Sequence, residues 1–96
     1  MLLARVVGTV VSNRKDEKLE GLKLLLLQQV DMSAKLTSGY VVAVDSVGAG
    51  VDEVVLFATG SSARQTRTTE NRPVDATVMA IVDSWDVHGA VQYRKE

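Results

Sequence analysis

The residues able to do metal or acid–base chemistry are few, and they do not form a recognisable motif. His88 is the only histidine, and the carboxylates Asp83 and Asp86 precede it closely. Such a group can bind a metal ion, but a single histidine beside a glycine in a predicted turn is typically a solvated surface residue. The chain has no cysteine, so a thiolate nucleophile or a Cys-ligated zinc is excluded. We expect no metal site.

Carboxylates are more numerous, and a pair of them can serve as a general acid and a general base. The candidates are Asp45, Asp52, Glu53, Asp75 and Asp83. All stand at expected strand ends or turns, where acidic residues commonly accept local hydrogen bonds. We therefore expect no catalytic residue, and the protein is not predicted to be an enzyme.

A glycine-rich segment, Val47–Asp52, is the other candidate binding element. It lacks the Lys and Ser/Thr of a phosphate-binding loop, and no long helix follows it. No nucleotide or other cofactor is therefore expected. Two glycines at positions 48 and 50 permit positive φ or the close approach of another backbone.

Length and composition indicate one domain, residues 1–96, with an ordinary globular composition. The 11 Lys and Arg residues nearly balance 12 Asp and Glu residues, for a formal net charge of -1. That charge provides no basic field for nucleic acid. No apolar run approaches the roughly 20 residues needed to cross a bilayer, so we expect no membrane partner. The lack of cysteine is compatible with an intracellular location.

Short apolar runs with two-residue alternation, separated by polar turns, predict an all-β fold. The expected strands are Leu2–Val11, Leu22–Val30, Tyr40–Asp45, Glu53–Thr59, Val74–Trp85 and Ala90–Tyr93. The leucines of the second segment are also good helix formers, so a helix remains an alternative there. After Gly60, we expect Ser61 or Ser62 to cap one short helical turn.

Five or six short strands with hardly any helix predict a closed or nearly closed barrel, because closure removes exposed sheet edges. A barrel of the OB type commonly binds single-stranded nucleic acid, and that is the alternative function. Such binding needs aromatic platforms, and aromatics are only 4% of the residues. They are scattered along the chain at Tyr40, Phe57, Trp85 and Tyr93, and we expect Phe57 in the core.

Several segments, taken in order, resemble a known family. They are Val6–Val11, Leu19–Leu25, Val42–Gly50, Gly60–Arg64, Pro73–Ala76 and Ile81–Asp83. Their sequences and spacing are similar to those of the bacterial microcompartment vertex proteins, a family that includes the EutN and CcmL types. The resemblance covers the chain from Met1 to about Asp83.

The resemblance implies a five-stranded OB-like β-barrel that assembles as a homopentamer. Head-to-tail contacts close into a ring when the rotation per subunit fits. The pentamer is expected to cap the vertices of a polyhedral shell in the bacterial cytoplasm, with hexameric shell proteins as its partners. The implied role is structural.

The family resemblance also implies the site residues. The residues expected to face the hexamers are Gly48, Ala49, Gly50, Glu53, Ile81, Val82 and Asp83. A second set of residues has two possible roles: Gly60, Ser61, Ser62 and Arg64. They are expected either to make contacts within the ring or at its central opening, or to form only a capped helical turn with a solvated cation. Asp52 departs from the family, which usually has glycine there.

Overall fold

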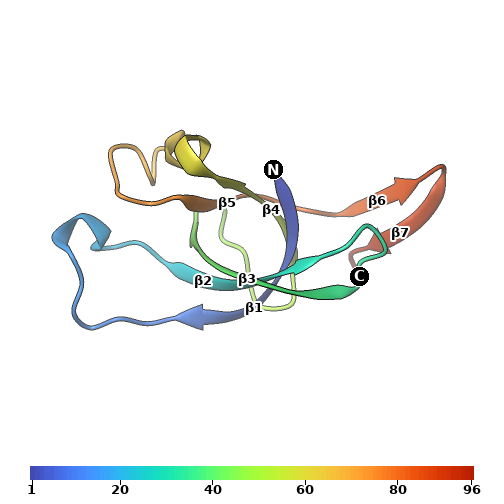
Figure 1. The fold of residues 1–96 in the computed structure, drawn as a ribbon, viewed down its shortest axis with the longest axis horizontal. Coiled ribbons are helices and arrows are strands. Elements are labelled where there is room, and N and C mark those ends of the chain that lie inside the picture. Colours follow the sequence, from blue (N-terminus) through green and yellow to red (C-terminus); the bar gives the residue numbers. More distant parts are fainter.

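The computed structural model describes all residues, 1–96, as seven β-strands and two short 3-10 helices (Figure 1). The strands are β1 (Leu2–Val10), β2 (Leu24–Val30), β3 (Leu36–Asp45), β4 (Val54–Thr59), β5 (Ala76–Ile81), β6 (Ser84–Val87) and β7 (Ala90–Arg94). The 3-10 helices are η1 (Glu17–Leu19) and η2 (Gly60–Arg64). The all-β fold with one helical turn after Gly60 is confirmed.

Five strands close into a barrel in the order β1-β2-β3-β5-β4, and β4 returns to β1. All neighbours are antiparallel except β3 and β5, which run parallel with Val44 beside Thr77. Every barrel strand therefore has a partner on both sides, although β3 pairs with β5 only at Val44 and Asp45. The predicted closed five-stranded barrel is confirmed.

The barrel encloses one hydrophobic core, because each strand turns alternate side chains inward. Ala4 and Val6 from β1, Leu25 and Leu27 from β2, and Phe57 from β4 are all at most 1% exposed. The full core cluster is Ala4, Val6, Leu25, Leu27, Ala43, Ala49, Val55, Phe57, Ala76 and Val78. Phe57 is in the core, as expected.

Helix η2 and the segment after it cover one side of the barrel and are held there by two buried threonines. The hydroxyls of Thr69 and Thr77 both donate to the carbonyl of Ala63, each at 2.7 Å. The predicted serine cap is wrong: the N-cap residue is Thr59, and its side chain makes no capping hydrogen bond. The helix begins at Gly60, so both serines lie inside its only turn.

The second segment is a strand, so the helical alternative is excluded; β2 pairs with β1 from Leu24 to Gln29 and with β3 from Leu24 to Val30, with one irregularity. Strand β3 begins at Leu36, four residues earlier than expected. The reason is a short turn, in which the carboxylate of Asp31 accepts hydrogen bonds from the backbone N–H groups of Ser33 and Lys35. Leu36 can then pair directly with Val30.

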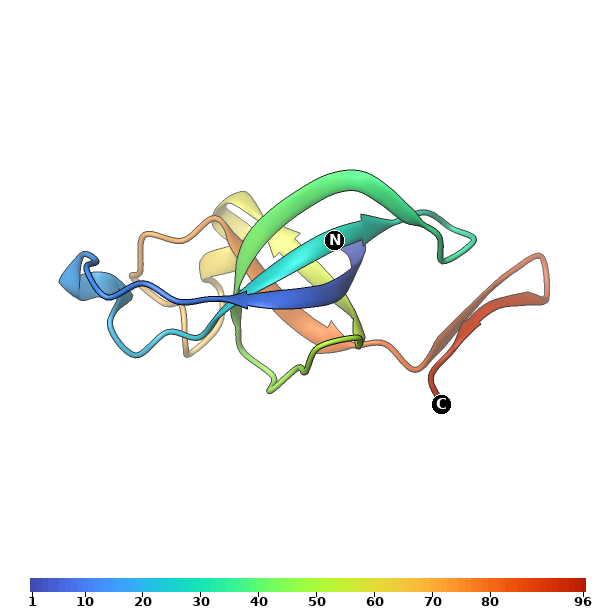
Figure 2. The same cartoon turned by 90° about the horizontal axis from the view of Figure 1, so that it is seen from below.

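The single strand predicted over Val74–Trp85 is wrong. Strand β5 ends at Ile81, the chain leaves the barrel at Val82 and Asp83, and β6 pairs with β7 in a separate two-stranded hairpin. Alternation continues through the break, which is why the pattern resembled one strand. The hairpin projects from one end of the barrel (Figure 2). Its turn falls at His88 and Gly89, as expected, and both have positive φ.

None of the helices has the length and apolar character that a membrane span requires.

Candidate functional site

The glycine-rich loop joins β3 to β4 and is shaped by the residue that ends β3. One carboxylate oxygen of Asp45 accepts hydrogen bonds from the backbone N–H groups of Val47, Gly48 and Ala49, at 3.1, 3.1 and 3.3 Å. Gly48 has a φ of +79°, a conformation that glycine adopts without steric cost. The carboxylate of Asp45 therefore serves to fold the loop.

The centre of the loop, Gly48–Gly50, presents backbone outward, because its one side chain, that of Ala49, is buried. Ala49 is 1% exposed and belongs to the core cluster. It therefore anchors the loop from beneath and offers no side chain to a partner. The exposed side chains of this segment are Val47, Val51 and Asp52.

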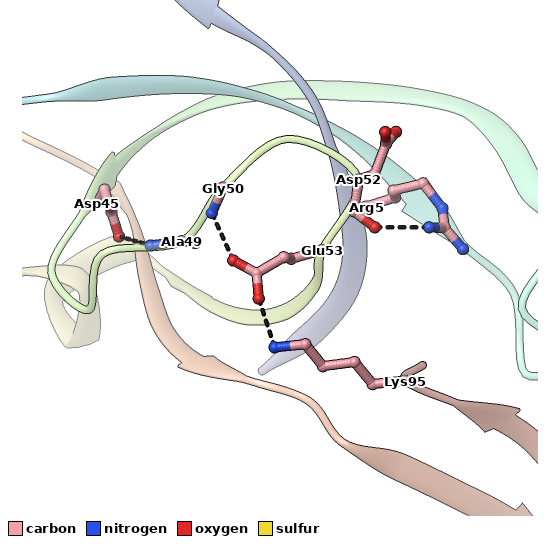
Figure 3. A network of polar contacts seen from close by, with 7 residues as sticks. All are labelled: Arg5, Asp45, Ala49, Gly50, Asp52, Glu53 and Lys95. Atoms are coloured by element: carbon pink, nitrogen blue, oxygen red, sulfur yellow. Dashed lines mark hydrogen bonds and ion pairs between the residues drawn. The ribbon is translucent and has the colours of Figure 1, made fainter.

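Glu53 closes the loop from its C-terminal side. One of its carboxylate oxygens accepts the backbone N–H of Gly50 at 2.6 Å, and the other accepts the ammonium of Lys95 at 2.6 Å (Figure 3). The hydrogen bond from Lys95, followed by that from Gly50, lowers the pKa of Glu53 below its ordinary value of 4.5. The same hydrogen bond raises the pKa of Lys95 above 10.5.

The loop is also attached to β1. The backbone N–H of Asp52 donates to the carbonyl of Val6 at 2.8 Å, and the guanidinium of Arg5 donates to the carbonyl of Asp52 at 2.7 Å. Asp52 has a φ of +75°. Aspartate tolerates this region better than most residues, although glycine fits it best. Asp52 therefore keeps the conformation that a glycine would favour and adds an exposed charge.

Ile81, Val82 and Asp83 lie beside this loop. Ile81 pairs with Val55, and the backbone N–H of Val82 donates to the carbonyl of Val54 at 2.8 Å. The backbone N–H of Lys95 donates to the carbonyl of Asp83 at 2.7 Å. Lys95 thus links Asp83 to Glu53. We call the resulting surface the rim: the loop Val47–Glu53 together with Ile81–Asp83.

The second predicted set lies apart from the rim. Gly60, Ser61 and Ser62 are exposed on η2, and the guanidinium of Arg64 donates to the carbonyl of Val74 at 3.0 Å. Helix η2 lies toward the end with the long β1–β2 connection, and the hairpin lies at the other end (Figures 1 and 2). The structure therefore brings the rim residues together and leaves the η2 residues as a separate group.

Comparison with known proteins identifies the family. A family model described as "Ethanolamine utilisation protein EutN/carboxysome" matches residues 1–83. The chain belongs to the EutN/CcmL family.

Named relatives within the EutN/CcmL family are shell vertex proteins. The carboxysome shell vertex protein CcmL of Nostoc sp. PCC 7120 is 54% identical and aligns over 100% of this chain and 96% of its own length. The bacterial microcompartment shell vertex protein PduN of Salmonella typhimurium is 51% identical over 88% of this chain and 97% of its own.

Solved structures of EutN/CcmL proteins have the same fold. The structure of Nostoc CcmL superposes with a TM-score of 0.95 over 99% of this chain and 100% of that one, at 54% identity. The pentameric microcompartment shell protein GrpN of Rhodospirillum rubrum superposes with a TM-score of 0.83 over 91% and 100%, at 41% identity. The prediction of a microcompartment shell vertex protein, located in a shell in the bacterial cytoplasm, is confirmed at the level of the family. The nucleic-acid alternative gains no support.

The sequence interpretation anticipated one of the two residues that shape the rim of this EutN/CcmL protein and missed the other. Asp45 was expected, with the other carboxylates at strand ends and turns, to accept local hydrogen bonds, and its three hydrogen bonds from backbone N–H groups confirm that expectation. Lys95 was not singled out, because its pairing with Glu53 spans 42 positions of sequence and leaves no local signal. His88 is exposed in the hairpin turn. No group of three or more His, Cys, Asp or Glu side chains is arranged to hold a metal ion.

Proposed function

We propose that residues 1–96 act as one domain that forms a homopentamer at the vertex of a microcompartment shell and docks its rim against flat hexameric shell proteins. The observation that carries the docking proposal is the convergence of the glycine loop and Ile81–Asp83 on one surface. These two segments are 28 or more positions apart in the sequence, yet Glu53 and Asp83 are joined through Lys95.

The lack of a side chain at Gly50 and the rigid anchoring of the loop favour close packing of the rim against a hexameric shell protein. At Gly50, an added Cβ would meet only the end of the Glu53 side chain, at 3.4 Å, so the position opens toward solvent. Its missing side chain lets a neighbouring backbone approach closely. Ala49 fixes the loop to the core, so the docking surface is held in shape before a partner arrives, which lowers the entropic cost of binding.

The role is proposed to be structural rather than catalytic, with no cofactor and no nucleic-acid partner. The two carboxylates that shape the loop both accept hydrogen bonds: Asp45, at the end of β3, from three backbone N–H groups, and Glu53 from Gly50 and Lys95. Neither is left free to move a proton to a substrate. The nearly balanced charge gives the protein no overall basic field for a phosphate backbone.

The docking proposal is tested by adding bulk at the rim. Gly50→Trp is expected to leave the pentamer intact and to block shell closure when the protein is co-expressed with hexameric shell proteins. Val11→Trp, which adds an equal side chain at a highly exposed position on the β1–β2 connection, is the matched control. Size-exclusion chromatography reports the ring, and electron microscopy reports closed shells. Normal closure with Gly50→Trp would show that the glycine loop is not the docking surface.

The stronger likeness to CcmL favours a carboxysome as the shell. The CcmL structure superposes with a TM-score of 0.95 at 54% identity, whereas an EutN structure that covers the whole chain reaches 0.89 at 38%, and GrpN reaches 0.83 at 41%. The test is expression in a carboxysome-forming host that lacks its own vertex protein. We expect closed carboxysomes to be restored; restoration only in a host with a different type of microcompartment would contradict the assignment.

A further inference from the structure

Three cationic side chains line one small hollow at the end of the molecule that carries the long β1–β2 connection (Figure 1). Its walls are Lys18 from η1, Arg64 from η2, and Asn71, Arg72 and Pro73 from the segment that leads to β5. The hollow has a volume of about 310 Å³, and no carboxylate lines it. We call it the basic hollow.

The positive charge of the basic hollow has no counter-charge within the chain. The formal net charge of the whole chain is -1, yet its only ion pair joins Lys95 to Glu53 at the rim. The three cations of the basic hollow therefore have no carboxylate partner. Like charges held close together repel one another unless an opposite charge lies between them. The arrangement favours an anion that comes from outside the chain.

The two arginines of the basic hollow are held in place by backbone carbonyls. Nη1 of Arg72 donates to the carbonyls of Lys18 and Glu20, at 2.6 and 3.0 Å. Nη1 of Arg64 donates to the carbonyl of Val74 at 3.0 Å. A guanidinium has five N–H donors, and the other nitrogens of both arginines make no hydrogen bond within the chain. Both side chains therefore keep their full charge and are ordered in advance, which lowers the entropic cost of binding an anion.

A second hollow adjoins the first, because Arg64 and Asn71 line both. Its volume is about 530 Å³, and no hydrophobic residue lines it. Hydroxyl, amide and charged groups of this kind form hydrogen bonds with a polyhydroxylated molecule and offer no contact to an apolar one. We call it the polar hollow. Its other walls are Ser61, Gln65, Thr66, Arg67 and Glu70.

We propose that the two hollows together bind a small phosphate monoester of a polyhydroxylated compound, such as a sugar phosphate. The phosphate group lies in the basic hollow, where two arginines and one lysine meet its charge of between about -1.5 and -2 at neutral pH. The hydroxyl groups of the ligand lie in the polar hollow. This binding function goes beyond the proposed shell role and does not depend on it, since one chain supplies every residue of the site.

Two other anions compete for the basic hollow. One is a carboxylate of a neighbouring copy of the chain, which brings one negative charge against three positive charges. The other is the phosphodiester of a single-stranded nucleic acid, whose binding normally combines cations with aromatic stacking platforms. No aromatic side chain lines either hollow. A phosphate monoester therefore matches both the charge and the polarity of the site best.

Isothermal titration calorimetry with glucose 6-phosphate, at low ionic strength, tests the proposal on the wild-type protein. We expect saturable binding of one molecule per chain. Lys18→Gln is expected to weaken this binding about tenfold, because one charge-assisted hydrogen bond is lost. The Lys18 side chain is exposed and makes no hydrogen bond in the structure, so the variant should fold normally. The matched control is Lys35→Gln, which removes an equal charge from an exposed lysine in the turn between β2 and β3 and should bind like the wild type.

Two further ligands separate the contributions of the two hollows. Inorganic phosphate should bind more weakly than glucose 6-phosphate, since it fills only the basic hollow. Phenyl phosphate should bind no more tightly than inorganic phosphate, because its ring forms no hydrogen bonds with the polar hollow. Gln65→Ala, at an exposed position in the polar hollow, should weaken the binding of glucose 6-phosphate and leave that of inorganic phosphate unchanged. Lys18→Gln should weaken both.

Three results would overturn the proposal. The first is no saturable binding at millimolar glucose 6-phosphate, or equal weakening by Lys18→Gln and Lys35→Gln. The second is loss of the oligomer in native mass spectra of Lys18→Gln, which would assign the cation to a contact with a neighbouring copy. The third is tighter binding of a single-stranded oligonucleotide than of glucose 6-phosphate, weakened by Lys18→Gln. None of these results bears on docking of the rim, which Gly50→Trp tests separately.

Discussion

The barrel and the β6–β7 hairpin are stabilised in different ways. The barrel has strands paired on both sides around a core of ten buried residues. The hairpin has no buried residue and depends on the stacking of Trp85 on Tyr93, with ring centroids 5.1 Å apart, and on a hydrogen bond from the Trp85 indole to the carbonyl of Met32. An isolated two-stranded hairpin is marginal in water. The fold is therefore set by the barrel, while the hairpin adds a weakly held arm whose tail reaches the rim.

The rim lies between the barrel and the hairpin and is held in place by contacts with both. Asp45 and Ala49 fix the glycine loop to the barrel, and Lys95 ties it to the end of the hairpin. If this division is correct, substitutions on the barrel side should change global stability, and those on the hairpin side should change local order only.

The largest effect is expected from Phe57→Ala, which opens a cavity in the core. Removing a buried phenyl ring costs about 3–5 kcal/mol in the free energy of unfolding. Guanidinium denaturation followed by circular dichroism measures it, with protein concentration held constant because assembly contributes to apparent stability. An effect no larger than that of Trp85→Ala would contradict the division between barrel and hairpin.

The next effect is expected from Asp45→Ala, which removes the acceptor for three backbone N–H groups of the loop. Loss of such partners costs about 1–3 kcal/mol. Asp75→Ala, at an exposed position with no side-chain hydrogen bond in the structure, is the matched control and should change little. The same denaturation experiment compares the two. Equal stabilities of both variants would show that Asp45 does not organise the rim.

A smaller effect is expected from Trp85→Ala. The variant loses an aromatic pair of the kind that contributes about 0.5–1.5 kcal/mol. Hydrogen exchange by mass spectrometry should show faster exchange over residues 84–94 and unchanged protection of β1 to β5. Faster exchange throughout the barrel would mean that the hairpin supports the fold as a whole.

The smallest effect is expected from pH, through the Glu53–Lys95 pair. The pKa of Glu53 is lowered, so its stabilising contribution is present above 4.5 and is lost as pH falls through the folded value. The pKa of Lys95 is raised, so its contribution is present below 10.5 and is lost as pH rises through the folded value. NMR spectra of the Gly50 amide should move at these two limits. Glu53→Gln should remove the acidic transition; a Gly50 amide that still shifts there would contradict the assignment.

Local patterns predicted most of the barrel. Alternation predicted the barrel strands, Phe57 was correctly expected in the core, and turn residues placed the loops between strands. The strand assignment failed where the local pattern carries no information about which strands pair with each other. Val74–Trp85 alternates without a gap, but Ile81 pairs with β4 and Ser84 pairs with Arg94, and only the tertiary structure separates them.

The rim residues were predicted from the family resemblance, and the local hydrogen bonding of Asp45 from its place at a strand end, but the hydrogen bond from Lys95 to Glu53 was not predicted. Glycines and Ile81–Asp83 belong to recognisable segments, whereas Lys95 reaches Glu53 across 42 positions of sequence. Such a contact depends on where the hairpin returns the C-terminal residues relative to the barrel, and the periodicity of apolar residues in the sequence does not encode that position. The separate placement of the η2 residues likewise follows from barrel geometry.

The most direct test of the central claim is native mass spectrometry of the purified wild-type chain at near-neutral pH and micromolar concentration. A self-assembling vertex protein should give one dominant species at five times the chain mass of 10.4 kDa. A persistent monomer, or a dominant species with another number of subunits, would contradict it.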